Sequence, residues 1–527
     1  MTSESINWDE DLSSDSEEEY QALVRTLKRK NGFGLFFVRC SPAEGDRLVG
    51  RVKKDITQKK IEVLKFDQPI HNLYEIVANL PQREQINILF IQGLEYSLYE
   101  YEREKFGKSS DRYNYNWKDV PQILNHLNQQ REKFRDDFNN ICFVFILRSF
   151  SIKYFIRRAP DFFDWRSGVF EFPTDSQTVE QELSRILLEG DYQKYLDLTP
   201  EERIQKIITI QELLEEDCQT SDNKVALLFE LGKLLSAAKE YEEAIASYDQ
   251  ALKINPNNND AWHSRGYALS NVGRYEEAIA SYDQALKINP NNNNAWYNRG
   301  IVLRKLERYE EAIASYDQAL KINPNNNDAW NNRGVALNYL GSYEEALDSY
   351  DQALKINPDD DDACYNRGVA LDAVGRYEEA IASFDQALKI SPDDDDACYN
   401  RGVALDAVGR YEEAIVSYNQ ALKISPDYDS ARKNRGMALM HLGRYEEAIA
   451  SFDQALEIDP DDDSAWYIRA CCYALQGNLE QAIENLQRAI ELNPEKYCQM
   501  AKTDSDFDSI REDERFQKLV QGISEDN

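Results

Sequence analysis

The chain has 527 residues and carries 61 Lys and Arg against 95 Asp and Glu, a net charge of −34. This acidity argues against nucleic-acid binding, because the protein would repel a phosphate backbone. No apolar run approaches the ~18–20 residues of a membrane helix, and the first residues lack an apolar core, so we expect neither a membrane span nor a secretory signal. The eight cysteines show no metal-like spacing, and we predict a reduced, cytoplasmic protein.

Two segments of different charge open the chain. Residues 1–19 contain eight acids and no Lys or Arg, and we predict an acidic disordered tail. Residues 20–175 carry a net charge of +6 and alternate strand-like and helix-like runs, as a parallel α/β sheet requires. The strands are expected at 33–40, 60–66, 86–95 and 141–147, and the helices at 17–32, 46–54, 71–80 and 120–138.

The stretch LFFVRCSPAEGDRLVGRV, residues 35–52, is typical of a strand, a tight turn at 41–47 and a helix. A P-loop protein carries G-x-x-x-x-G-K-[ST] at such a turn. The order of elements resembles the nucleotide-binding domains of signal-transducing AAA-related ATPases, as in bacterial proteins with repeat arrays. The resemblance implies a P-loop-like parallel sheet and places INILFIQGLE at the Walker B strand, with Glu95 as the acid in reach.

The turn has lost the chemistry of a P-loop. Pro42 removes one backbone N–H, Glu44 and Asp46 place negative charge where a phosphate would lie, and no Lys follows Gly45. We therefore predict a degenerate domain without Mg²⁺-dependent hydrolysis, without a cofactor and without a metal. Weak anion binding at the free N–H groups of the following helix stays an alternative. Its candidate residues are Ser41, Gly45, Arg47 and Glu95.

Residues 176–222 are predicted to form a helical linker. Within it, Thr199 and Pro200 open a helix in the manner of an N-cap followed by proline at the first helical position. This helix is expected to cap the segment that follows and to join it to the first domain.

A fixed period of 34 residues dominates the second half. Y-E-E-A begins at Tyr241 and returns every 34 residues up to Tyr445, and a proline keeps the same period from Pro256 to Pro494. The period and the pattern of each unit, such as residues 261–290, resemble the tetratricopeptide repeat. The resemblance implies eight helical hairpins over 223–496 that stack into an all-α superhelix with a concave groove. Residues 497–527 are predicted to supply a C-terminal capping helix and a tail.

Several recurring residues have structural interpretations within each unit. Glycine equivalent to Gly266 allows two helices to approach closely, and the Asn or Asp run after each proline supplies N-caps. The PDDDD runs suggest calcium as an alternative, but they lack the glycine and the distal glutamate of an EF-hand loop. Cys364 and Cys398 are interpreted as small core residues, with a catalytic cysteine as the alternative.

The groove carries a column of polar residues. In tetratricopeptide geometry, positions 5 and 6 of each first helix face the groove, and this chain repeats Tyr and Asn there. The amides resemble the asparagine ladder in the repeats of O-linked N-acetylglucosamine transferases and suit an extended peptide backbone. The alternative is that they are polar surface residues copied by duplication. The predicted groove residues are Tyr297, Asn298, Asn332, Tyr365, Asn366, Tyr399, Asn400 and Asn434.

Together these patterns predict a non-enzymatic scaffold. It would bind peptides or partner proteins in the groove, with the first domain as a docking or regulatory module. The alternative is a nucleotide-gated signalling switch, in which ATP binding to the first domain controls access to the repeats. The sequence contains no Ser/His/Asp set, metal cluster or intact glycine-rich loop that would favour an enzyme.

Overall fold

The computed structural model describes residues 16–98, 122–148, 151–152, 155, 159–172, 176–215 and 220–521. The predicted acidic tail lies almost entirely outside these residues. The chain divides into two compact units, residues 1–290 and 291–527. This division falls inside the repeat array, so the predicted segment boundaries at 19, 175, 222 and 496 stay predictions.

The described part of the first unit contains a five-stranded parallel sheet with the order β2-β3-β4-β1-β5. Phe36 of β1 pairs with Val144 of β4 on one side and with Gly168 of β5 on the other. The central strands are continuous apolar runs, as expected for strands buried on both faces. The strands are β1 (Gly34–Arg39), β2 (Ile61–Lys65), β3 (Ile88–Gln92), β4 (Cys142–Leu147) and β5 (Gly168–Glu171).

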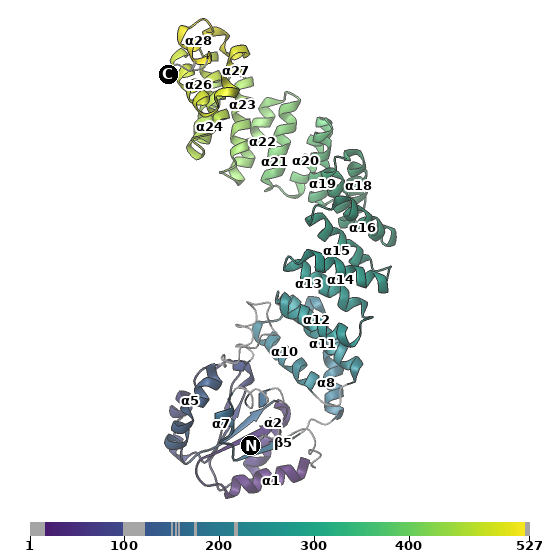
Figure 1. Ribbon diagram of the computed structural model, residues 1–527, viewed down its shortest axis with the longest axis vertical. Coiled ribbons are helices and arrows are strands. Elements are labelled where there is room, and N and C mark those ends of the chain that lie inside the picture. The colour runs from purple at the N-terminus through teal and green to yellow at the C-terminus, as the bar shows by residue number, and fades with distance from the viewer. Residues whose placement is uncertain are drawn as a thin grey trace, which may run out of the picture. The chain divides into compact units, whose positions relative to one another are not determined.

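Helices cover both faces of this sheet (Figure 1). Phe36 and Val38 face one side with helices α1 (Ser16–Arg29) and α2 (Pro42–Asp55). Leu35 and Phe37 alternate with them and face the other side. That side is covered by helices α3 (Leu73–Ala78), α5 (Gln122–Asp137) and α7 (Pro160–Phe163). A short 3-10 turn, η1 (Arg83–Gln85), precedes β3. The predicted parallel α/β architecture is therefore confirmed.

The predicted turn at 41–47 is wrong. Helix α2 begins at Pro42, four residues before the predicted start at Asp46. The Ser41 hydroxyl accepts a hydrogen bond from the backbone N–H of Glu44 (3.3 Å) and caps the helix. Proline at the first helical position loses no hydrogen bond, because that N–H has no partner within a helix. The connection from β1 to α2 is therefore only Cys40 and Ser41.

Three helices follow the sheet: α8 (Ser176–Glu189), α9 (Tyr192–Leu196) and α10 (Pro200–Glu215). Thr199 and Glu202 form a reciprocal capping box at the start of α10, with N···O distances of 3.2 and 2.9 Å. All three helices contact α11 (Ser221–Ala237), the first helix of the array. The buried hydroxyl of Tyr195 donates to the Glu230 carboxylate of α11 at 2.9 Å.

The array consists of eight helix pairs in the described residues. The pairs of the first unit are α11 with α12 (Tyr241–Ile254) and α13 (Asn259–Asn271) with α14 (Tyr275–Ile288). The second unit holds six pairs that follow one another in chain order (Figure 1). They are α15 (Asn293–Lys305) with α16 (Tyr309–Ile322), α17 (Asn327–Tyr339) with α18 (Tyr343–Ile356), α19 (Asp361–Ala373) with α20 (Tyr377–Ile390), α21 (Asp395–Ala407) with α22 (Tyr411–Ile424), α23 (Asp429–His441) with α24 (Tyr445–Ile458), and α25 (Asp463–Leu475) with α26 (Leu479–Leu492).

In seven of the eight helix pairs, a glycine of the first helix lies against an aromatic ring of the second helix. A Cβ added to Gly368 would lie 2.6 Å from the ring of Phe384, closer than real Cβ contacts allow. The same clash would occur at the equivalent glycines, where the ring is Tyr or Phe. The prediction that glycine allows this approach is confirmed.

Short polar residues cap the first helices as predicted, except at α23. Asp360 and Asp394 accept hydrogen bonds from the N–H groups of Ala363 and Ala397, each at 2.9 Å. These two acids of the PDDDD runs are therefore helix caps. Tyr428 occupies the equivalent position before α23 and makes no side-chain cap.

The tryptophans at the start of other first helices hold the preceding loop. The Trp330 indole donates to the carbonyl of Pro324 at 2.9 Å. In the unit that begins at Asp361, Cys364 replaces this tryptophan and is fully buried. Gln386 of α20 then donates to Pro358 at 3.0 Å, so the proline carbonyl keeps a partner.

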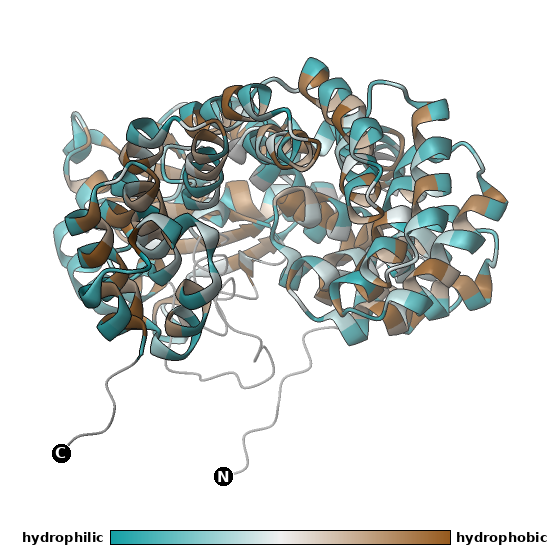
Figure 2. Cartoon of the chain, turned by 90° about the horizontal axis from the view of Figure 1, so that it is seen from above, coloured by the Kyte–Doolittle hydropathy of each residue, from teal (hydrophilic) through white to brown (hydrophobic). Residues whose placement is uncertain are grey.

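The last helices close the apolar end of the array. They are α27 (Pro494–Thr503), the 3-10 helix η2 (Ser505–Ile510) and α28 (Glu514–Val520). Phe507, Ile510 and Phe516 are buried in one cluster with Tyr467 of α25. Each helix carries both hydrophobic and hydrophilic residues, as a stacked array requires (Figure 2).

Candidate functional site

In the compact unit of residues 291–527, the first helices of the repeats form one continuous surface. Successive first helices contact one another more closely than successive second helices do, so the first helices line the inner side of the stack. We count positions in α15, α17, α19, α21 and α23 from Asn293, Asn327, Asp361, Asp395 and Asp429. The surface formed by positions 5, 6, 9 and 12 of these helices is called the inner face.

Hydrogen bonds join the predicted groove residues in pairs across the inner face. The amide nitrogen of Asn400 donates to the hydroxyl of Tyr365, one unit earlier, at 3.1 Å. Asn434 and Tyr399 make the same bond at 3.2 Å. Asn332 and Tyr297 form the equivalent pair at 3.3 Å. Asn332, Asn400 and Asn434 therefore each lie against the preceding unit rather than isolated on the surface. Asn298 occupies the equivalent position 6 of α15.

Sequence reasoning missed one member of this row. Asn331 occupies position 5 of α17, where neighbouring units have tyrosine, and its side-chain oxygen accepts a hydrogen bond from Asn366 at 3.1 Å. The sequence did carry a signal for Asn331, because it occupies the repeat position that holds tyrosine in α15, α19 and α21. The row is therefore continuous from α15 to α23, with an amide in place of one hydroxyl.

These contacts determine which groups face a ligand. The amide nitrogens of Asn332 and Asn400 also donate to the backbone carbonyls of Asp328 (2.8 Å) and Asp396 (2.9 Å). Both hydrogens of each amide are then engaged, and the side-chain oxygen is left as an acceptor. The expected contact with a peptide backbone stays a prediction. For Asn332 and Asn400, the side-chain oxygen is the atom that would accept a hydrogen bond from a peptide N–H.

The tyrosines add donors to the same surface. Burial raises the pKa of Tyr297 and of Tyr365 to about 12. Both hydroxyls therefore stay protonated at neutral pH. Each accepts a hydrogen bond from an amide and can donate its own hydrogen elsewhere. The inner face thus offers alternating donors and acceptors beside half-buried aromatic rings.

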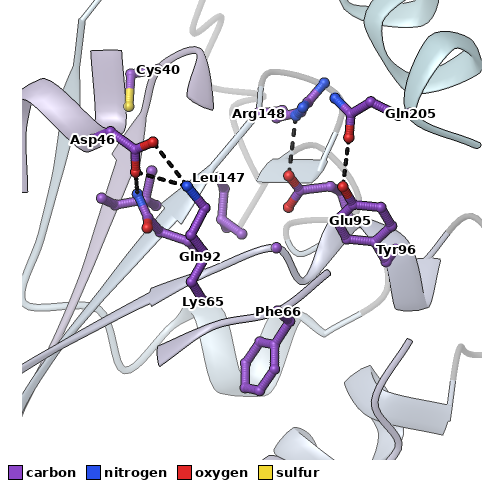
Figure 3. A pocket seen from close by; sticks show the side chains of 12 residues that line it. Cys40, Asp46, Lys65, Phe66, Gln92, Glu95, Tyr96, Leu147, Arg148 and Gln205 are labelled. Carbon is purple, nitrogen blue, oxygen red and sulfur yellow. Dashed lines mark hydrogen bonds and ion pairs between the residues drawn. The ribbon is translucent and has the colours of Figure 1, made fainter. Parts of the chain in front are cut away.

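A second candidate site lies at the carboxyl edge of the sheet. The chain leaves β1 toward β2 but leaves β4 toward β5, on the opposite side of β1. Parallel α/β sheets place ligands at such a switch point. A cavity of about 220 Å³ opens there (Figure 3). It is lined by Cys40, Asp46, Lys65, Phe66, Gln92, Gly93, Glu95, Tyr96, Ile146, Leu147, Arg148 and Gln205.

The predicted anion-site residues are only partly brought together. Ser41 caps α2, and the N–H of Gly45 donates to the Ser41 carbonyl at 2.8 Å, as within a helix. The Arg47 side chain is 71% exposed and lies 3.4 Å from Glu44. Glu95 is the one predicted residue that lines the cavity. Asp46, which sequence reasoning counted only as a liability, also lines it and pairs with Lys65 at 2.8 Å.

Glu95 belongs to a buried ionic cluster. Its carboxylate accepts a hydrogen bond from Nε of Arg148 at 3.1 Å, and the two residues are 5% and 4% exposed. Arg148 also donates to Glu212 of α10 at 2.5 Å. The Tyr96 hydroxyl donates to Gln205 of the same helix at 2.5 Å. Helix α10 therefore contacts the carboxyl edge. The sequence predicted that this helix joins the array to the first domain, but it did not predict this point of contact.

One group in the described part of the chain has donor atoms close enough for a metal ion. It consists of Cys471, Asp504 and Asp506, with the atoms within 4.8 Å of one another. Asp504 already accepts a hydrogen bond from Tyr467 at 2.7 Å. Among the described helices, none combines the length and the apolar character needed to cross a membrane.

Comparison with known proteins identifies the repeats. The family model described as Tetratricopeptide repeat matches eight overlapping segments that together span residues 211–496, more than half of the chain. No curated protein matches the chain.

Solved structures match parts of the chain. YrrB, described as a TPR protein with an unusual peptide-binding site, is 29% identical, and the match covers 35% of this chain and 95% of YrrB with a TM-score of 0.32. A tetratricopeptide repeat protein from Parabacteroides merdae ATCC 43184 is 21% identical, covering 50% and 99% of the two chains with a TM-score of 0.36. Pseudomonas aeruginosa pilF is 17% identical, covering 42% and 100% with a TM-score of 0.37.

Proposed function

The chain belongs to the tetratricopeptide repeat family, and we propose that it is a non-enzymatic scaffold that binds extended segments of partner proteins along its inner face. The observation that carries this proposal is the unbroken row of hydrogen-bonded side chains from Tyr297 to Asn434. Such a row presents the same groups at every unit. An extended chain also repeats its carbonyl and N–H groups, and amide oxygens and hydroxyls match both.

Because the side chains of the row are already packed against one another, they lose little conformational entropy when a partner binds. Each tyrosine hydroxyl is held by the asparagine of the next unit, so its ring is already oriented before a partner arrives. Pre-organised side chains lose less conformational freedom on binding and leave more of the interaction energy as affinity. Tyrosine also supplies large contact area with few rotatable bonds.

Peptide selection tests this proposal. A random peptide library is selected against the full chain, and the enriched peptides are measured on the wild type, on Tyr399→Ala and on Asp348→Ala. Asp348 lies exposed on the second helix α18, away from the inner face. We expect peptides that lose about tenfold affinity or more on Tyr399→Ala and none on Asp348→Ala. Enriched peptides that bind both variants equally would contradict an inner-face site.

The α/β part is proposed to act as a docking or regulatory module. Its support is the connection through α10, which contacts Arg148 at the carboxyl edge and packs on α11 of the array. A conformational change at the carboxyl edge of the sheet would therefore be transmitted to the first repeat through α10. Buried ionic contacts of this kind are sensitive to the loss of either partner.

The alternative is a nucleotide-gated switch built on a degenerate P-loop-like sheet. The observation that favours it is the cavity at the switch point, where α/β sheets bind ligands. Its volume of about 220 Å³ is below the ~300–1,000 Å³ of ordinary small-molecule sites. The connection of two residues between β1 and α2 also leaves no loop of successive N–H groups to surround a phosphate.

Calorimetry of the full chain with ATP, with and without Mg²⁺, decides between the two functions. The scaffold proposal expects no heat of binding at millimolar ATP and peptide affinities that ATP does not change. Micromolar ATP binding together with altered peptide affinity would establish the switch instead.

A further inference from the structure

Two carboxylates lie on the inner face at equivalent positions of two identical helices. Helices α19 and α21 share the sequence DDACYNRGVALDA, and position 12 is Asp372 in one and Asp406 in the other. In each helix, positions 5, 9 and 12 fall on one side, because residues four and three apart lie above one another. Each carboxylate therefore shares its side with a valine and with the tyrosine of the hydrogen-bonded row.

Both carboxylates have an oxygen without a partner. The Oδ1 atoms of Asp372 and Asp406 are buried, and no described residue donates a hydrogen bond to either. Burial raises the pKa of both carboxyl groups. A buried polar atom without a partner costs free energy, and a charged donor supplied by a ligand would remove that cost.

The charge of the inner face changes along the array. Position 12 is Arg304 in α15, Asn338 in α17 and Met440 in α23. Position 2 adds Asp328 in α17, Asp362 in α19 and Asp396 in α21. Positions 2 and 13 lie one helical turn from positions 5 and 9 and so border the inner face. None of positions 2, 5, 6, 9, 12 and 13 is Lys or Arg in α17, α19 or α21. The acidic charge is therefore densest on the two identical helices, which carry two of these carboxylates each, whereas α17 carries one.

We propose that α19 and α21 bind an extended peptide segment that carries two basic side chains about three residues apart, one for Asp372 and one for Asp406. This inference rests on the proposed scaffold function and adds the chemistry of the partner. Packed helices lie ~8–10 Å apart, and an extended chain rises ~3.3 Å per residue, so equivalent points on two neighbouring helices are about three residues apart. Guanidinium groups favour paired contacts with carboxylates, so arginine suits these positions.

Three pools of nonapeptides test the inference on the full chain. Each pool has uncharged residues randomised at seven positions and Arg, Gln or Glu fixed at the fourth and seventh positions. Peptides captured from each pool are measured by fluorescence anisotropy against the wild type, Asp372→Asn/Asp406→Asn and Tyr399→Ala. The matched control is Asp348→Asn, which makes the same chemical change on exposed α18.

We expect the Arg pool to be enriched, and its peptides to lose about tenfold affinity per substituted carboxylate, a loss that Asp348→Asn does not reproduce. Their affinity should also fall as salt rises. Equal binding by the double variant overturns the inference. Enrichment of Gln or Glu peptides that depend on Tyr399 overturns it but leaves the scaffold function intact. If no pool binds while the random library yields peptides that depend on Tyr399, the inference fails and the scaffold function stands.

Discussion

The side-chain amide of Asn400 donates a hydrogen bond to the hydroxyl of Tyr365, 35 residues earlier, at 3.1 Å. This bond joins the first helices of two successive units, so one pair of residues serves both the stacking of the array and its inner face. A substitution at either residue is therefore expected to change stability as well as binding.

Asn366→Ala with Asn400→Ala tests both roles. Each substitution removes one inter-unit hydrogen bond, which contributes about 0.5–1.5 kcal/mol to stability. We expect a lower urea midpoint, unchanged helical circular dichroism of the folded protein, and weaker binding of selected peptides. Asn325→Ala, in the loop before α17, is the matched control. Unchanged peptide affinity in the double variant would exclude the amides from the binding surface.

The array was predictable because its signals are local and repeated. The equivalents of Gly368, Pro358 and the caps recur every 34 residues in most units, so the same interpretation applied in one unit after another. The pairing of Asn400 with Tyr365 depends instead on how units stack. This pairing is seen only in the folded structure, where position 6 of one repeat lies against position 5 of the repeat before it.

The carboxyl edge of the sheet was less predictable. The dipeptide Ser41-Pro42 is an N-cap followed by proline at the first helical position. The sequence analysis did not use this local signal, because the resemblance to a P-loop placed a turn there. Arg148 had no local signal at all. Its two partners lie 53 and 64 residues away, and one of them comes from α10.

Gly368→Ala is expected to destabilise the array by about 1–3 kcal/mol, because the new methyl group would overpack the contact with Phe384. The measurement is urea unfolding followed by circular dichroism. Gly368→Ala combined with Phe384→Leu should recover part of the loss, since the smaller side chain makes room for the methyl group. A midpoint equal to that of the wild type in the single variant would show that the helices can separate without cost.

Arg148→Met is expected to loosen the carboxyl edge. The substitution leaves Glu95 and Glu212 without their cation in a buried site, a change that costs about 3–5 kcal/mol in comparable cases. We expect faster amide hydrogen exchange in β4 and in α10, measured by mass spectrometry. Arg148→Met with Glu95→Gln and Glu212→Gln removes the charges together and should restore most of the protection. Unchanged exchange in the single variant would show that the cluster does not hold α10 to the sheet.

Asp372→Asn with Asp406→Asn should stabilise the unbound protein at neutral pH. Burial raises the pKa of both carboxyl groups above the unfolded value of 3.8, with His441 partly opposing the shift at Asp406. The folded protein therefore binds these protons more tightly than the unfolded chain does. In the wild type, the unfolding free energy is lowered as pH rises from below 3.8 through the folded pKa, and the asparagine variant lacks this loss.

Urea unfolding across that range should show the two proteins converging in acid and the variant more stable near pH 7. Asp348→Asn, which removes an equal charge from an exposed position, should leave the pH dependence as it is in the wild type. A double variant less stable than the wild type at neutral pH would mean that the carboxylates stabilise the array themselves, rather than being held ready for a basic partner.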